Sequence, residues 1–131
     1  ASIRAAYLQL HGQADAVIVE GIGGWRVPLS GTDTTADLVR ALEIPVLLVV
    51  GLRLGCINHA LLSVESIASE GIPLAGWVAN HLDPGFSERT EVINYLTEQI
   101  AAPLIGTVPH LQDFQPDRVA EALAIELLAL A

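Results

Sequence analysis

Short apolar runs recur along this 131-residue chain, and stretches with helical periodicity separate them. The runs contain many β-branched residues and are expected to form buried strands, whereas the stretches between them place apolar residues three or four positions apart. The predicted strands are 16–20, 44–50, 74–80 and 104–108. Strands that alternate with helices of about 10–15 residues favour right-handed crossovers. The chain is therefore predicted to form an α/β fold, with a parallel sheet and helices on both faces.

Five segments carry the helical pattern. The predicted helices are 2–11, 34–42, 56–70, 88–100 and 117–130. Asp33 or Thr34 is expected to cap the second helix, and Ser87 the fourth, because their side chains can accept hydrogen bonds from free backbone amides. Gly71 is expected to end the third. The predicted inner face of the fourth helix carries Val92, Leu96 and Ile100.

Composition indicates a globular protein with a substantial core, since 52% of the residues are hydrophobic. We expect one α/β domain over residues 1–131. The net charge of −9 and the scattered arginines argue against nucleic acid as a partner. The longest apolar run contains Pro45 and is too short to cross a membrane. Cys56 is the single cysteine, which fits a reducing compartment. A cytoplasmic protein with no membrane contact is expected.

Two residue types are absent. All six basic residues are arginines, so the 131 residues contain no lysine of a phosphate-binding P-loop. The chain also contains no methionine. We interpret it as a portion of a longer polypeptide.

The predicted strand 16–20 ends in Glu20 and runs into a glycine-rich turn at residues 21–24. In open α/β sheets the carboxyl ends of the strands border the ligand crevice, and glycines let the backbone approach a ligand closely. A carboxylate at this position can bind Mg²⁺ beside phosphates, or it can cap a nearby helix. The pattern alone leaves both roles open.

The segment Gly55–His59 opens a predicted helix. Its free amides and the positive end of the helix dipole suit a carboxylate or a phosphate. Cys56 at this position could be a nucleophile, but an inert packed thiol is favoured because no base can be identified for it. His59 is interpreted as a structural histidine.

Two further features lie at the predicted ligand edge. Asn80 ends a strand and could pair with an adenine edge or, alternatively, bond its own backbone in a turn. The segment Pro109–Leu111 could form the wall of a base pocket. By contrast, Gly31–Thr35 lacks a following Gly-Lys-Thr and is expected to shape a turn and a helix cap rather than bind a nucleotide.

Together these segments resemble one enzyme family, the dethiobiotin synthetases. The likeness extends almost continuously from about Ala14 to Leu111, and no single block would be specific alone. Five ordered blocks carry it: Val19–Trp25 with Pro28 and Leu29, Pro45–Gly51, Leu54–Ala60, Leu74–Asn80 and Pro109–Leu111.

The resemblance implies a P-loop NTPase-like three-layer fold and a homodimer that converts 7,8-diaminopelargonate, CO2 and MgATP into dethiobiotin, ADP and phosphate. It implies that Glu20 is a magnesium ligand. The ATP-binding residues that it implies are Glu20, Gly21, Ile22, Gly23, Asn80, Pro109, His110, Leu111 and Asp117. The substrate-binding residues that it implies are Gly24, Gly55, Cys56, Ile57 and Asn58, the last four receiving the substrate carboxylate across the dimer interface. His81 stands where the family can carry an acidic residue.

The family's P-loop and catalytic lysines would lie upstream, so the resemblance matches this chain to the C-terminal portion. No catalytic residue is expected within it, and the chain alone is expected to be inactive. Two alternatives stay open: a regulatory or dimerisation domain without a P-loop, and a related ATP-dependent amide ligase such as the cobyrinate amidating enzymes.

Overall fold

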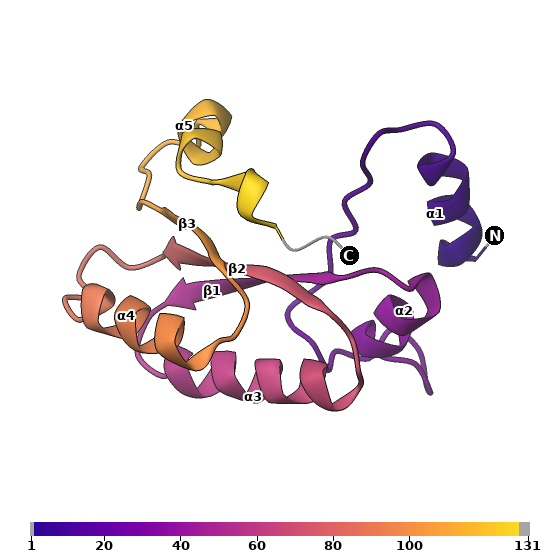
Figure 1. Cartoon of the computed structure of the whole chain (residues 1–131), viewed down its shortest axis with the longest axis horizontal. Helices are drawn as coiled ribbons and strands as arrows, with labels where there is room; N and C mark the ends of the chain where they lie inside the picture. The colour runs from indigo at the N-terminus through magenta and orange to yellow at the C-terminus, as the bar shows by residue number, and fades with distance from the viewer. Residues whose placement is uncertain (1, 129–131) are drawn as a thin grey trace. The chain divides into compact units, whose positions relative to one another are not determined.

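The computed structural model describes residues 2–128. The chain divides into two compact units, Ala1–Ile44 and Pro45–Ala131, and each is described by itself. Figure 1 shows the elements of both units. The prediction of a single domain stays a prediction.

The first unit contains two helices, α1 (Ile3–His11) and α2 (Thr35–Leu42). Both were predicted, with bounds that differ by a residue or so. Ser2 caps α1, because its Oγ accepts a hydrogen bond from the Ala5 amide at 3.2 Å. Thr34, one of the two candidates, is the N-cap of α2.

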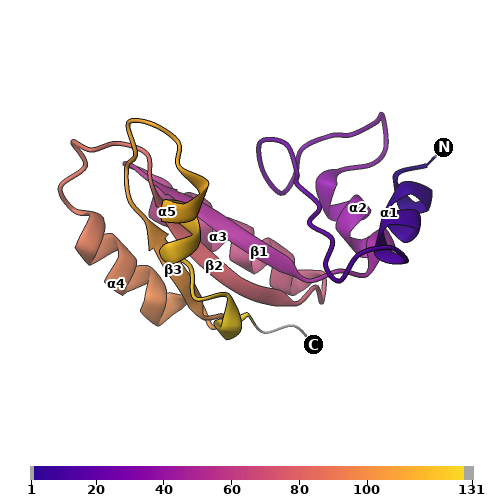
Figure 2. The same cartoon turned by 90° about the horizontal axis from the view of Figure 1, so that it is seen from above.

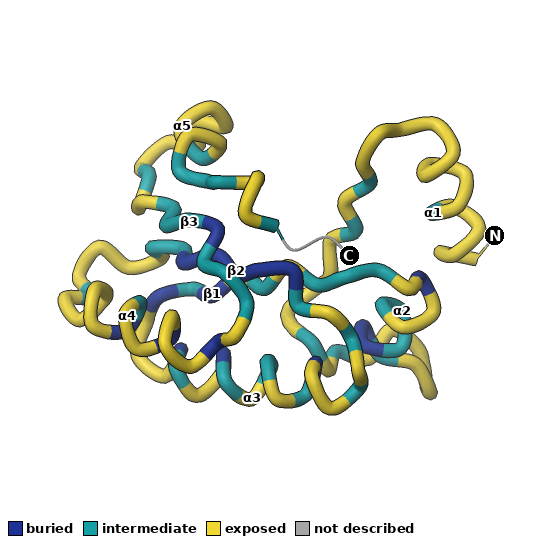
Figure 3. The backbone as a smooth tube through the Cα atoms, viewed as in Figure 1, coloured by how far each residue is buried: buried dark blue, intermediate teal, exposed yellow. Residues whose placement is uncertain are grey.

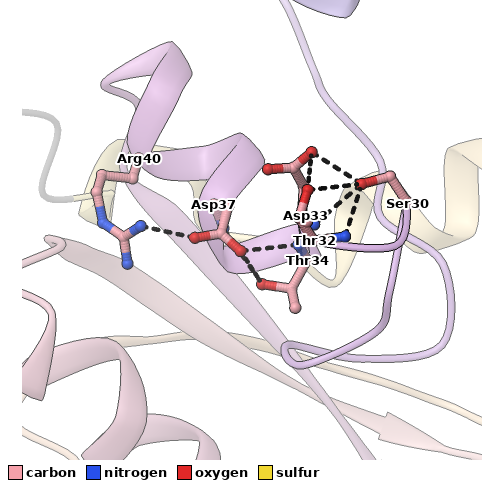
Figure 4. Close-up of polar contacts among 6 residues, drawn as sticks. All are labelled: Ser30, Thr32, Asp33, Thr34, Asp37 and Arg40. Atoms are coloured by element: carbon pink, nitrogen blue, oxygen red, sulfur yellow. Dashed lines mark hydrogen bonds and ion pairs between the residues drawn. The ribbon is translucent and has the colours of Figure 1, made fainter.

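A capping box holds the start of α2 (Figure 4). The Thr34 amide donates to the Asp37 carboxylate at 2.8 Å, and the Asp37 amide donates to Thr34 Oγ1 at 3.4 Å. Arg40 donates to the other carboxylate oxygen of Asp37 at 2.8 Å. These bonds lower the pKa of Asp37 to about 2, the Thr34 hydroxyl being the largest cause. The polar segment before α2 thus shapes a turn and a cap, as predicted.

The predicted strand 16–20 is wrong for this structure. The segment has no strand or helix assignment, and Ile18 is 94% exposed. A strand is stable only where a neighbouring strand accepts its backbone hydrogen bonds, and the described part of the first unit contains no strand. Apolar β-branched residues therefore do not form a strand here.

The second unit is built on a parallel sheet of three strands, β1 (Val46–Leu52), β2 (Leu74–His81) and β3 (Leu104–Val108), in that spatial order. Helix α3 (Cys56–Ser69) connects β1 to β2, and α4 (Arg89–Gln99) connects β2 to β3. Figures 1 and 2 show both helices on the same face of the sheet. The alternation of strands and helices predicted for this half of the chain is confirmed.

The main core lies between the sheet and this helix pair (Figure 3). Trp77 of β2 and Leu96 of α4 are fully buried in it. All three residues predicted for the inner face of this helix are buried, as the helical spacing indicated; Val92 and Leu96 lie within α4, and Ile100 is its C-cap. Each large apolar side chain buried in this way contributes about 1.5–3 kcal/mol to folding. On the opposite face of β1, Leu47 and Val49 remain 44% and 58% exposed.

The end of the chain differs from its prediction. A continuous helix over 117–130 was expected, but α5 spans only Pro116–Glu121 and the next element is a 3₁₀ helix, η1 (Ile125–Leu127). Between them, Leu123 forms an antiparallel bridge with Gly106, and the Ala124 amide donates to the Ile105 carbonyl at 2.8 Å. Pairing with the outer edge of β3 replaces helical hydrogen bonds there. The predicted end at Leu130 lies outside the described residues.

Helix α5 lies on the side of the sheet away from α3 and α4 (Figures 1 and 2). The second unit therefore carries helices on both faces of its sheet, as predicted. Among residues 2–128 no helix is both long enough and apolar enough to cross a membrane.

Candidate functional site

The carboxyl ends of the three strands meet at one edge of the second unit. In register, Asn80 of β2 stands between Gly51 of β1 and Val108 of β3. Pro109, His110 and Leu111 follow Val108 directly, so the fold brings this segment beside Asn80. The Asn80 side chain makes no hydrogen bond with the described residues, so it does not adopt the alternative turn role. Its assignment to an adenine pocket stays a prediction.

The start of α3 lies at the same edge. Gly55, the N-cap, adopts φ of +90° and offers no side-chain cap. The Cys56 amide donates to the Arg53 carbonyl at 3.1 Å, but the Ile57 and Asn58 amides have no partner within the described residues. Free amides at the positive end of a helix dipole attract an anion. The geometry predicted from the sequence is therefore present.

A pocket of about 540 Å³ opens beside this helix start. Its wall is mainly apolar, and it is partly open to solvent. Of the predicted substrate-binding residues in this unit, Gly55, Cys56 and Ile57 line it and Asn58 does not. The other lining residues are Arg53, Leu54, Phe86, Glu88 and Val92.

The core fixes part of the pocket wall. Cys56 and Val92 are 5% and 7% exposed and belong to the buried cluster, and Phe86 packs against that cluster. Burial of Cys56 agrees with the interpretation as a packed thiol. Leu54, by contrast, is 93% exposed. One side of the pocket is thus formed by core residues and another by an exposed loop.

Two opposite charges border the pocket. Arg53 is exposed and forms no ion pair within residues 2–128. Glu88 is the N-cap of α4 without a side-chain cap bond, so the prediction of Ser87 in that place is wrong. A hydrogen bond from the Ser87 side chain lowers the pKa of Glu88, with a smaller lowering by its own backbone amide. Glu88 is therefore ionised at neutral pH.

Sequence reasoning did not place Phe86, Glu88 or Val92 in a site. Val92 was assigned to the core, where it indeed lies, and periodicity cannot show that it also borders a pocket. Phe86 follows an Asp-Pro-Gly turn and has no repeating pattern around it. The one available signal was an aromatic residue in a loop at the predicted ligand edge.

His81 ends β2 and is partly buried. Its Nε2 is enclosed and has no hydrogen-bond partner within the described residues. Burial lowers the pKa of His81, and the positive charges of Arg89 and His110 lower it further. His81 is therefore neutral at pH 7.

The predicted site residues of the first unit are all exposed: Glu20, Gly21, Ile22, Gly23 and Gly24. Gly23 and Gly24 adopt φ of +71° and +136°, which glycine allows. Thr35 Oγ1 donates to the carbonyls of Gly24 and Trp25 and ties this turn to α2.

No group of three or more possible metal-binding side chains occurs in residues 2–128. Magnesium often takes one or two carboxylates and completes its shell with water and phosphates, so a lone exposed Glu20 fits that mode. Asp117 lies exposed in the first turn of α5. The roles of Glu20, the glycine turn and Asp117 stay predictions.

Comparison with protein families defines the class of this chain. A family model described as an AAA domain matches residues 1–118. The chain belongs to this AAA domain family, and the P-loop NTPase-like α/β fold predicted from the sequence is confirmed.

Curated relatives are more specific. An ATP-dependent dethiobiotin synthetase of Aromatoleum aromaticum is 54% identical over 125 residues, which cover 95% of this chain and 56% of the relative. The corresponding enzyme of Pseudomonas aeruginosa is 52% identical over 118 residues, covering 90% of the chain and 52% of the relative. That of a Janthinobacterium strain is 48% identical over 128 residues, covering 98% and 54%. The chain spans about half the length of these relatives, and the predicted resemblance is confirmed.

Proposed function

We propose that the protein carrying this chain is an ATP-dependent dethiobiotin synthetase, a carbon–nitrogen ligase of biotin biosynthesis. One observation of the structure supports the proposal most directly. The pocket at the start of α3 is lined by three of the residues that the family resemblance assigns to the substrate carboxylate. The identity of about half of all residues with enzymes of that name supports it further.

The reaction joins 7,8-diaminopelargonate and CO2. One substrate amine adds to CO2 and loses a proton, giving a carbamate. ATP transfers its γ-phosphoryl group to a carbamate oxygen, and ADP leaves. The second amine then attacks the carbamoyl carbon and loses a proton, phosphate departs, and a cyclic urea closes. Binding that holds the second amine beside the activated carbon is the main catalytic demand of this last step.

In this proposal the second unit binds the substrate tail. The free amides of Ile57 and Asn58, with the charge of Arg53, attract the carboxylate, and the apolar wall contacts the methylene chain. The ionised Glu88 repels a carboxylate and so favours an orientation with that group toward α3. A homodimer, in which one protomer's pocket serves the other's reacting groups, belongs to the same proposal.

The nucleotide contacts that the family resemblance implies are proposed for each unit by itself. Asn80 with Pro109, His110 and Leu111 would hold the adenine, and Asp117 would contact the nucleotide. Gly21, Ile22 and Gly23 would border it, and Gly24 the substrate. Glu20 would hold Mg²⁺, which supplies positive charge to the phosphates when bound.

We also propose that the 131-residue chain alone has no turnover. Phosphoryl transfer needs positive charge around the γ-phosphate, and this sequence contains no lysine. The test compares the chain with a polypeptide of the relatives' full length that carries it. Only the longer form should convert 7,8-diaminopelargonate, CO2 and MgATP into dethiobiotin, measured by mass spectrometry. Dethiobiotin formed by the chain alone would refute the inactivity, and none from the longer form would refute the function.

The names of the relatives favour this function over the two alternatives. A cobyrinate amidating enzyme should bind a corrinoid acid and ignore 7,8-diaminopelargonate in calorimetry. A regulatory domain should show no ATP-dependent reaction in any length of polypeptide.

A further inference from the structure

The lining of the pocket beside α3 has two chemically different parts, one polar and one apolar. Its lining includes Ile57, whose amide is unpartnered within the described residues, and the cation Arg53, and both suit a carboxylate. The unpartnered Asn58 amide follows at the same helix start, although Asn58 does not line the pocket. Most of the remaining wall is hydrocarbon, which suits an unbranched aliphatic chain. Cys56 and Val92 of the lining belong to the buried core cluster. Something else must decide how long a chain the pocket accepts.

Phe86 is the one aromatic side chain among the lining residues. Phe86 belongs to the loop before α4, whereas the amides proposed to bind the carboxylate belong to the start of α3. The loop holds it firmly, since the Gly85 amide donates to Asp83 Oδ1 at 2.8 Å and the Phe86 amide to the Asp83 carbonyl at 3.2 Å. Its ring also packs against the core cluster. A held, partly buried ring is a wall rather than a mobile cover.

We propose that Phe86 is the specificity-determining residue that sets the length of the aliphatic chain accepted beside the α3 helix start. This inference rests on the proposed function. A carboxylate held by the α3 amides directs its chain along the apolar wall, and the phenyl ring limits the room available to that chain. Replacing the ring by a smaller side chain lengthens the accepted chain, and a larger ring shortens it.

The first experiment uses the chain itself and unbranched carboxylates from hexanoate to decanoate. Binding is followed by NMR through the amide signals of Ile57 and Asn58. Each buried methylene should tighten binding about fourfold, the gain expected from about 0.8 kcal/mol, until the chain meets Phe86. Beyond that length the gain should stop. Phe86→Ala should extend the gain by one or two methylenes, and Phe86→Trp should end it sooner.

Phe114→Ala is the matched control. It removes the other phenylalanine of the chain, which is 78% exposed and does not line the pocket, so the limiting length should not change. Phe86→Leu covers the case in which Phe86→Ala fails to fold, because leucine keeps an apolar contact with the core. A limiting length that is the same in all folded Phe86 variants would overturn the proposal. So would the absence of any carboxylate binding by the unchanged chain.

The second experiment uses the full-length enzyme. Phe86→Leu should raise kcat/KM for the substrate homologue that is one methylene longer, relative to 7,8-diaminopelargonate, by about fourfold. If the unchanged enzyme makes dethiobiotin but this ratio does not move, the role of Phe86 is wrong and the proposed function stands. If the unchanged enzyme makes no dethiobiotin, the proposed function itself fails.

Discussion

Replacing Leu96 by alanine tests the packing that supports the candidate pocket. Leu96 is fully buried, with 0% of its surface exposed to solvent. It lies one helical turn beyond Val92, which lines the pocket. The substitution removes three carbon atoms, so the lost transfer free energy is about 2.4 kcal/mol at about 0.8 kcal/mol per methylene. A residual cavity adds to this loss. The free energy of unfolding should fall by about 3–4 kcal/mol, within the range for buried leucines.

Urea unfolding followed by circular dichroism measures this change. Leu54→Ala is the matched control, because the same atoms are removed from a side chain that is 93% exposed. It should change the free energy of unfolding by less than about 0.5 kcal/mol. Equal losses in the two variants, or a loss below about 1 kcal/mol for Leu96→Ala, would refute the packing of α4 described above.

Three further predictions concern other parts of the chain. Gly106→Ala should lower the free energy of unfolding by about 1–3 kcal/mol, because its Cβ would overlap the Ala122 carbonyl, whereas Gly31→Ala meets nothing within 4 Å and should be near neutral. The folded state lowers the pKa of His81 below its ordinary value of 6.5, so stability should fall as the pH drops through 6.5, and His81→Gln should remove that part of the urea-unfolding profile. On the proposed function, Glu20→Gln in the full-length protein should weaken magnesium-dependent dethiobiotin formation at least about tenfold, and an unchanged magnesium titration would contradict the metal role proposed for Glu20.

Local patterns predicted most of the second unit. The inner face of α4 follows from apolar spacing alone, and Gly71 ends α3 because its φ of +68° suits glycine. The sequence also predicted an anion-binding geometry at the start of α3. The first amides of any helix lack partners within that helix, so this prediction needs no tertiary contact.

Non-local contacts explain the failures. Residues 17–19 have the composition of a strand, but strand formation needs a partner, and composition cannot supply one. The final helix stops at Glu121 because residues near Leu123 pair with β3 instead. Ser87 has a good capping side chain, yet α4 begins one residue later. The local preference is thus overridden by the lack of a pairing strand at residues 17–19, by pairing with β3 near Leu123, and by a one-residue shift of the helix start at Ser87.

The sequence by itself determined that the second unit alternates strands and helices, that the chain lacks a P-loop lysine and that it resembles the dethiobiotin synthetases. Those properties depend on residue types and spacing along the chain. Only the tertiary structure decided that Phe86, Glu88 and Val92 join the start of α3 around one pocket. The sheet order and the crossover helices bring these residues together. Their positions along the chain do not show that they form a pocket.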